Sequence, residues 1–307
     1  MGKILVTPRS VTKGGHPSLA QITQAGHEVV LGPAGRQPTE DELLELLPPC
    51  IGYLAGVEPV TARVLAAATN LRAISRNGTG VDNVDLAAAE AKGIKVLRAE
   101  GANARGVAEL AIAFLLALAR RIPFSDAALK AGKWERAGGI ELEGKTLGLI
   151  GCGRIGRLAT EMALGLGMNV IAYDLMPLLS FAPSPRFRFA EMAEVYSSAD
   201  FLSLHCPPPT HGRPLLDADT LQTMKRGVFI INTARFDLFD VTALLKALNT
   251  GQVAAVATDV FDHEPPQDFS LVRHPNVIAT PHIGGFTAES IERAMDAAIQ
   301  NLLLALA

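Results

Sequence analysis

Short runs of apolar and β-branched residues alternate with helical patterns along the whole chain. In the first third, the apolar runs that predict strands lie at residues 4–6, 29–31, 53–54, 73–75 and 94–96. Helical patterns at 18–24 and 40–47 separate the first of these runs, and alanine-rich stretches follow the later ones. Such alternation is typical of βαβ units, so it predicts a parallel sheet.

A second series of the same kind begins near Thr146, after a long apolar helix predicted over 104–121 and an irregular, glycine-rich stretch. The strands predicted for this series are 147–150, 170–173, 201–204, 228–231, 254–257 and 277–279. Six parallel strands are what a doubly wound dinucleotide-binding domain needs. A final helix is predicted over 288–304, with Thr287 as its N-cap and Glu289 in its first turn.

Composition narrows the class of protein. The chain has 307 residues, of which 49% are hydrophobic and 19% charged, and this is typical of a globular protein large enough for two cores. The net charge is −3 with no long run of one sign, so neither nucleic acid nor a membrane is an expected partner. Widely spaced Cys50, Cys152 and Cys206 favour a reducing compartment over a disulfide framework or zinc site. No export signal is recognised, so we expect a cytoplasmic location.

A glycine motif opens the second series. Gly151, Gly153 and Gly156 form G-x-G-x-x-G between a predicted strand and a predicted helix. In dinucleotide-binding folds these glycines permit a tight turn, close approach of backbone to a pyrophosphate, and packing of helix on strand. Asp174 lies 18 residues after Gly156, where a carboxylate binds adenosine ribose hydroxyls and repels a 2′-phosphate. The motif predicts NAD as the cofactor; the alternatives are a structural turn beside a chance acid, and a methyltransferase loop.

Titratable side chains follow three late strands of this series. Arg235, Glu264 and His282 each come after a different strand, so they should meet at the ligand-binding edge of the sheet. A guanidinium can bind the carboxylate of a 2-oxo acid, an imidazole can protonate its carbonyl oxygen, and a carboxylate can orient that imidazole. The structural alternatives are a surface cation, a turn cap and a buried histidine. His205 is a competing base, because it also ends a strand.

With these motifs in place, the chain resembles the D-2-hydroxyacid dehydrogenase family, and within it the 3-phosphoglycerate dehydrogenases. The matching stretches are 76–83, 133–136, the glycine motif, 232–235, 259–266 and 281–284. The resemblance implies hydride transfer between NAD and C2 of a small D-2-hydroxy or 2-oxo acid. It also implies an α/β protein with a Rossmann cofactor domain over 100–284 and a flavodoxin-like substrate domain formed by 1–99 and 285–307. Members of the family are usually homodimers built on the cofactor domain.

The resemblance also implies a role for each matching residue. The catalytic residues would be Arg235, Glu264 and His282. The residues that meet the substrate acid would be Arg76, Asn77, Gly78 and Arg235. The residues that line the cofactor would be Thr79, Gly151, Gly153, Arg154, Ile155, Gly156, Asp174, Cys206, Thr233, Ala234, Asp259, His282 and Gly284. Among these, Asp259 would hold the nicotinamide carboxamide, and no metal is expected.

The chain departs from the phosphoglycerate dehydrogenases near the predicted substrate site. Ala55-Gly56 replace an Arg-Ser pair that contacts substrate in those enzymes, and Phe236-Asp237 replace the usual Gly-Gly. Glu58 and Asp237 add negative charge where a phosphate would need cations. The chain also ends at Ala307, without the C-terminal regulatory domains that some of those enzymes carry.

These departures predict an unphosphorylated acid as substrate. The alternative is 3-phosphoglycerate, with a basic residue of the first loop, Arg9 or Lys13, in place of the missing arginine. An alternative from another functional class is an NAD-sensing binding protein of the corepressor type, which would keep the glycine motif and Asp174.

Overall fold

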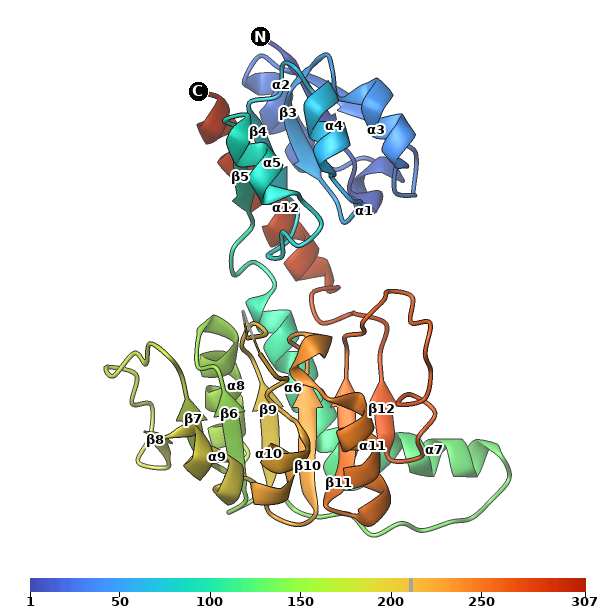
Figure 1. Ribbon diagram of the computed structural model, residues 1–307, viewed down its shortest axis with the longest axis vertical. Coiled ribbons are helices and arrows are strands. Elements are labelled where there is room, and N and C mark those ends of the chain that lie inside the picture. The colour runs from blue at the N-terminus through green and yellow to red at the C-terminus, as the bar shows by residue number, and fades with distance from the viewer. Residues whose placement is uncertain (210–211) are drawn as a thin grey trace. The chain divides into compact units, whose positions relative to one another are not determined.

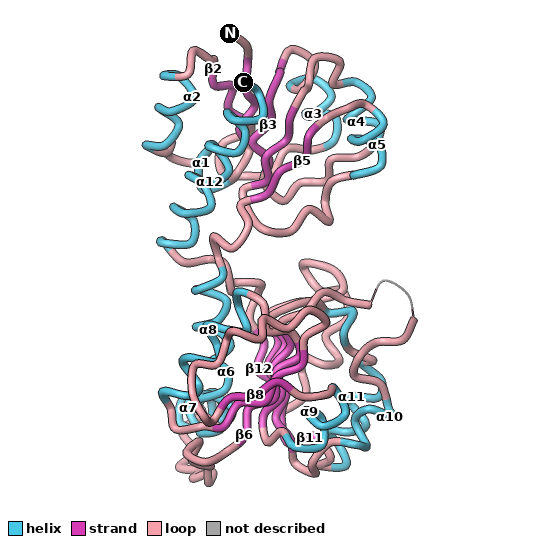
Figure 2. Tube along the Cα trace, turned by 90° about the vertical axis from the view of Figure 1, so that its left-hand side faces the viewer, coloured by secondary structure: helices cyan, strands magenta, loops and turns pink. Residues whose placement is uncertain are grey.

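The computed structural model describes residues 1–209 and 212–307, which divide into two compact units (Figure 1). Unit 1 comprises Met1–Asn103 and Thr287–Ala307, and unit 2 comprises Ala104–Phe286. Each unit has a parallel sheet with helices on both faces, so each has three layers (Figure 2). The α/β class and the parallel sheets predicted from the sequence are confirmed.

Unit 1 has a five-stranded sheet in the order β2-β1-β3-β4-β5. Its strands are β1 Lys3–Val6, β2 Glu28–Leu31, β3 Cys50–Ala55, β4 Ala73–Arg76 and β5 Lys95–Arg98. Its helices are α1 Arg9–Thr12, the 3₁₀ turn η1 Pro17–Leu19, α2 Ala20–Gln24, α3 Glu40–Leu46, α4 Ala62–Ala67, α5 Leu86–Ala91 and α12 Ala288–Leu306. This strand order is that of flavodoxin-like sheets, and its direction of winding reverses between β1 and β3.

The last helix completes a core of unit 1. Met295, Ile299 and Leu302 of α12 are fully buried and pack with residues of β1 and β3, among them Ile4 and Leu54. Thr287 caps α12 as predicted, since its side chain accepts a hydrogen bond from the Ser290 amide at 3.1 Å. Residues from the two ends of the chain therefore share one core.

Unit 2 has a seven-stranded parallel sheet in the order β12-β11-β10-β9-β6-β7-β8. Its strands are β6 Thr146–Ile150, β7 Asn169–Tyr173, β8 Phe187–Phe189, β9 Phe201–Leu204, β10 Val228–Asn232, β11 Val253–Thr258 and β12 Val277–Ala279. Its helices are α6 Ala104–Arg120, α7 Ile122–Lys130, α8 Arg154–Gly165, α9 Met192–Ser198, α10 Ala218–Thr223, η2 Phe236–Leu238 and α11 Val241–Thr250. The winding reverses between β6 and β9, which is the ligand-binding position of doubly wound sheets.

Two elements of unit 2 were not predicted. The edge strand β8 has three residues, too few for a periodic signal, and Arg188 interrupts its apolar pattern. The helix predicted over 104–121 ends at Arg120, and Arg121, with φ of +52°, separates it from α7. Pro123 lies at the start of α7, a position where proline is tolerated. No helix in the described ranges is long and apolar enough to cross a membrane.

Candidate active site

The glycine motif forms the turn between β6 and α8, at the point where the sheet of unit 2 reverses. Gly151 has φ of +95°, and a Cβ there would lie 2.4 Å from the carbonyl oxygen of His205. A Cβ on Gly156 would lie 2.3 Å from the carbonyl oxygen of Gly151. Backbone atoms therefore leave no room for a side chain at position 151 or at position 156. A Cβ on Gly153, by contrast, would meet no atom within 4 Å, so this side of the turn is open for a ligand.

The N-terminus of α8 fits an anion. Gly153 is its N-cap and has no side chain to cap the helix, and the amides of Arg154 and Ile155 make no hydrogen bond in the described part of the chain. Free amides and the helix dipole favour a phosphate here. The residues present thus fit the pyrophosphate of a dinucleotide.

Asp174 lies directly after β7 and is bound to the same turn. Its Oδ2 accepts a hydrogen bond from the amide of Cys152 at 2.7 Å, and its Oδ1 accepts one from the amide of Met176 at 2.9 Å. A carboxylate oxygen can accept more than one hydrogen bond, so Asp174 retains capacity for a ribose hydroxyl. Leu175 and Met176 beside it are 84% and 88% exposed and offer apolar surface for an adenine ring.

The structure joins His282 and Glu264, which the sequence places on separate loops after β12 and β11. The His282 Nδ1 lies 2.7 Å from both carboxylate oxygens of Glu264. Both side chains are about half exposed, so the pair is accessible to a ligand. With Nδ1 on the carboxylate, the Nε2 atom of His282 is the one that can exchange a proton with a substrate.

Asp259, at the end of β11, organises the loop that carries His282. Its buried carboxylate accepts hydrogen bonds from the Thr280 hydroxyl at 2.5 Å, the Ile283 amide at 2.8 Å and the Gly284 amide at 2.7 Å. A Cβ on Gly284 would lie 3.1 Å from this carboxylate, which explains a glycine there. His282 itself has φ of +53°, so its backbone relies on this support.

Arg235 follows β10 in a turn fastened by Asn232. The Asn232 side chain accepts a hydrogen bond from the Ala234 amide at 3.0 Å and donates one to the Arg235 carbonyl at 2.8 Å. The hydroxyl of Thr233 is buried without a partner in the described ranges, so it is available for a bound group. Asn232 and Thr280 were not predicted as supports, although Asn232 ends β10 and Thr280 directly follows β12, each just before a predicted site loop.

Phe236 and Asp237, the residues that replace Gly-Gly, form the short helix η2. Phe236 packs against the core cluster of unit 2 and stacks edge-on with Phe239, with ring centroids 6.4 Å apart. These contacts bury part of the Phe236 ring against the core of unit 2.

His205 and Cys206 end β9, next to the glycine turn. Burial lowers the pKa of His205 to about 4, so its imidazole stays neutral at physiological pH, and its Nε2 lies 2.9 Å from the Ser203 hydroxyl. Such a low pKa makes the imidazole a poor proton acceptor, which disfavours His205 as the competing base. Burial raises the pKa of Cys206 to about 11, so the thiol remains protonated beside the cofactor position.

The predicted substrate residues of unit 1 follow β4. Arg76 is buried; its Nε donates to the Asn83 side chain at 3.0 Å and its Nη1 to the carbonyl of Asn77 at 3.2 Å. The Gly78 amide donates to the Arg76 carbonyl at 2.8 Å, so this amide is already engaged. The amide of Thr79 makes no hydrogen bond in the described ranges and can receive an anion.

One family model and several known proteins match this chain. Residues 112–284 match the model of the NAD-binding domain of the D-isomer specific 2-hydroxyacid dehydrogenases. Over 262 residues the chain is 43% identical to human D-3-phosphoglycerate dehydrogenase, with 83% of this chain and 48% of that protein aligned. It is 42% identical over 260 residues to hydroxypyruvate reductase of Thermotoga maritima, with 83% and 84% aligned. The chain thus spans about half the length of the phosphoglycerate dehydrogenases it matches.

A solved structure is also similar to this chain over nearly its whole length. A crystal structure of a Thermus thermophilus protein superposes with a TM-score of 0.87 at 35% identity, over 99% of this chain and 96% of that one. The family model covers the glycine turn, Asp174 and the loops of Arg235, Glu264 and His282. The chain therefore belongs to the D-isomer specific 2-hydroxyacid dehydrogenase family.

Proposed function

We propose that this protein is an NAD-dependent dehydrogenase that acts at C2 of a small, unphosphorylated D-2-hydroxy or 2-oxo acid. The observation that carries the proposal is the pairing of His282 with Glu264 at 2.7 Å, at the same sheet edge as the glycine turn and Arg235. An NAD-sensing binding protein needs only the glycine turn and Asp174, whereas catalysis also needs an oriented, accessible imidazole. Unit 2 would bind the cofactor and unit 1 would contribute Arg76, Asn77 and Gly78 to the substrate.

Four side chains would have separate roles in binding and catalysis. Bound NAD would supply or accept the hydride at C2. The His282 Nε2 would give a proton to the C2 oxygen during reduction and take it back during oxidation, while Glu264 holds Nδ1 and stabilises the charged imidazole. The guanidinium of Arg235 would bind the substrate carboxylate. Asp174 would favour NAD over NADP by repelling a 2′-phosphate.

A substrate panel tests this proposal. We expect oxidation of NADH, followed by its absorbance, with hydroxypyruvate or glyoxylate, and much slower oxidation of NADPH. We expect 3-phosphohydroxypyruvate to be the poorer substrate. A preference of about 100-fold or more for the phosphorylated acid, about 2.7 kcal/mol, would reverse the substrate assignment. NADH binding without turnover of any acid would instead favour a binding protein of the corepressor type.

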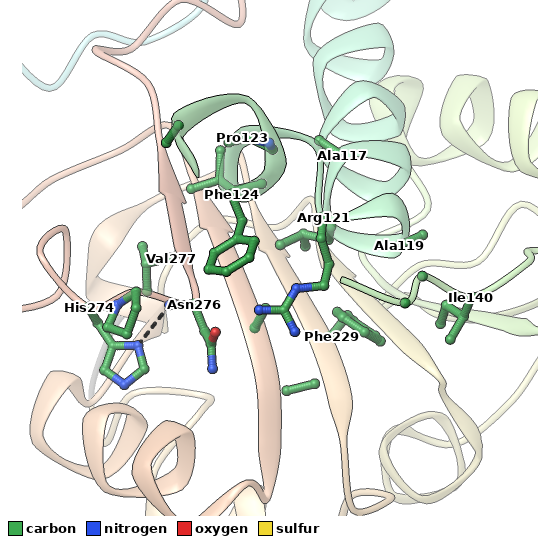
Figure 3. A pocket seen from close by; sticks show the side chains of 18 residues that line it. Ala117, Ala119, Arg121, Pro123, Phe124, Ile140, Phe229, His274, Asn276 and Val277 are labelled. Carbon is green, nitrogen blue, oxygen red and sulfur yellow. Dashed lines mark hydrogen bonds between the residues drawn. The ribbon is translucent and has the colours of Figure 1, made fainter. Parts of the chain in front are cut away.

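We also propose that unit 2 forms a homodimer. Trp134, the only tryptophan of the sequence, is 84% exposed, and Ile122, Phe124 and Leu129 are exposed on α7, none of whose residues is buried. Beside them lies a cavity of about 410 Å³, into which Phe124 and Arg121 project (Figure 3). Its lining includes the amino ends of β10 to β12, the edge opposite to the predicted site. Apolar and aromatic surface of this kind is typical of protein interfaces.

Sedimentation tests the dimer directly. We expect a mass of twice the 32.4 kDa of the chain, and the Trp134→Glu variant should sediment as a monomer. The Glu135→Gln variant, in the same segment, is the control and should remain dimeric. A wild-type protein that stays at 32.4 kDa at high concentration would contradict the proposal.

A further inference from the structure

A buried carboxylate lies where the sheet of unit 1 reverses its winding. β1 ends at Val6 and β3 ends at Ala55, and the residues just beyond these ends are Thr7 and Gly56. Glu58 is fully buried beside them. In doubly wound sheets the crevice at such a reversal is the place where ligands bind. In unit 1 this place holds a side chain of the protein itself.

Three donors converge on one oxygen of Glu58. Its Oε1 accepts hydrogen bonds from the Thr7 hydroxyl, the Tyr53 hydroxyl and, at 2.9 Å, the Gly56 amide. Burial and the charge of Glu58 raise the pKa of Tyr53 well above its ordinary value, so the phenol keeps its proton and donates it. Two hydroxyls and a backbone amide are also the donors that a small bound anion would use.

The other oxygen of Glu58 fills the position of a missing side chain. Its Oε2 is buried and makes no hydrogen bond within the described ranges. A Cβ on Gly56 would lie 2.6 Å from this atom. Glycine at 56 and glutamate at 58 are therefore sterically coupled, since a side chain at 56 and the carboxylate of 58 compete for one volume.

Arg76 is linked through Asn83 to the backbone of Glu58. The Asn83 side chain accepts from the Arg76 Nε at 3.0 Å and donates to the backbone carbonyl of Glu58 at 2.7 Å. Burial lowers the pKa of the Arg76 guanidinium, and the negative charge of Glu58 opposes that effect. The negative charge of Glu58 offsets part of the positive potential that a ligand of Arg76 would meet.

We infer that Glu58 is a positioning residue that occupies the anion position of unit 1 and, through Arg76, disfavours acids that carry a phosphate. This inference rests on the proposed function, because it assigns Arg76 to the substrate. A carboxylate substrate brings one negative charge to Arg76, which the remaining positive potential accommodates. A phosphate adds roughly two more charges, and Glu58 already uses the donors that would stabilise them.

The Glu58→Gln variant tests the inference, because glutamine keeps the size and the acceptor oxygen but removes the charge. We expect the ratio of kcat/KM for 3-phosphohydroxypyruvate to kcat/KM for hydroxypyruvate to rise about tenfold, a modest value for one buried charge. The rise should come mainly from a lower KM for the phosphorylated acid rather than from a change in kcat. A structural role alone would change both acids alike. Glu90→Gln removes the same charge from an exposed position on α5 and should leave the ratio unchanged.

A second variant covers the case in which Glu58→Gln does not fold. Gly56→Ser alone should destabilise the protein because of the clash with Glu58, and adding Glu58→Thr should relieve that loss. The double variant should raise the same ratio in the same direction. An unchanged ratio, within twofold, in a folded variant would overturn the inference.

Measurements of ligand binding can test the role of Glu58 independently of the proposed function. Titration calorimetry with 3-phosphoglycerate and with D-glycerate measures the same preference without turnover. If no acid is turned over but Glu58→Gln still strengthens 3-phosphoglycerate binding relative to D-glycerate, the proposed function fails and the role of Glu58 stands. If turnover occurs but neither ratio moves, the role of Glu58 fails and the proposed function stands.

Discussion

The His282→Ala variant should lose about 100-fold or more in kcat for hydroxypyruvate reduction, the usual consequence of removing a general acid. The Nε2 of His282 is the proton donor in the proposed reaction, and His205, whose lowered pKa keeps its imidazole neutral, is a poor substitute for it. NADH binding, followed by nucleotide fluorescence, should be retained, because the glycine turn and Asp174 are untouched. A kcat within about threefold of wild type would remove His282 from the chemistry.

The backbone of His282 calls for a matched variant. Its φ of +53° is unfavourable for alanine, so part of the loss in His282→Ala could come from a displaced loop. Asparagine tolerates this conformation and has no titrating group, so His282→Asn should lose as much kcat while melting close to wild type. Glu264→Gln keeps a hydrogen-bonding group beside Nδ1 without the charge and should lose less, about tenfold, since the pair is half exposed.

The Arg235→Lys variant should lower kcat/KM for 2-oxo acids by about 100-fold and leave NADH binding intact. A guanidinium binds a carboxylate through two parallel hydrogen bonds, and an ammonium group keeps the charge but cannot reproduce this geometry. The turn fastened by Asn232 contacts the backbone of Arg235, so the substitution should not disturb the fold. Arg213→Lys, at an exposed position of the same unit, controls for the chemical change itself. Unimpaired turnover in Arg235→Lys would place the carboxylate elsewhere.

The sequence predicted the elements whose signals are local. Apolar runs identified the strands of both sheets except β8. The glycine motif between β6 and α8 identified the cofactor turn, in which backbone contacts require glycine at 151 and 156. Thr287 was recognised as a cap because N-caps have side-chain preferences that a sequence displays directly. The sequence also predicted that Arg235, Glu264 and His282 follow parallel strands, and the structure places them on the loops after β10, β11 and β12.

Contacts between distant residues could not be predicted in the same way. The hydrogen bonds of Asp259 to the loop of His282 depend on how β11 and β12 pair, which residue patterns do not encode. Phe236 was recognised only as a departure from the usual Gly-Gly, because the direction of its side chain is set by the turn into η2 and by the core below it. From the sequence, Glu58 was recognised only as an added negative charge. Its hydrogen bonds were not predicted, because the partners Thr7 and Tyr53 lie on two other segments of the chain.

The path of the chain through unit 1 has a consequence for synthesis. Met295, Ile299 and Leu302 are synthesised more than 200 residues after Ile4 and Leu54, yet they pack with them in one core. At roughly 5–20 residues per second, the first strands wait on the order of ten seconds or longer for these partners. Unit 2, made entirely within that interval, can fold first. Until α12 is synthesised, the nascent N-terminal sheet exposes apolar residues such as Ile4 and Leu54. We therefore expect chaperones to bind this sheet during synthesis.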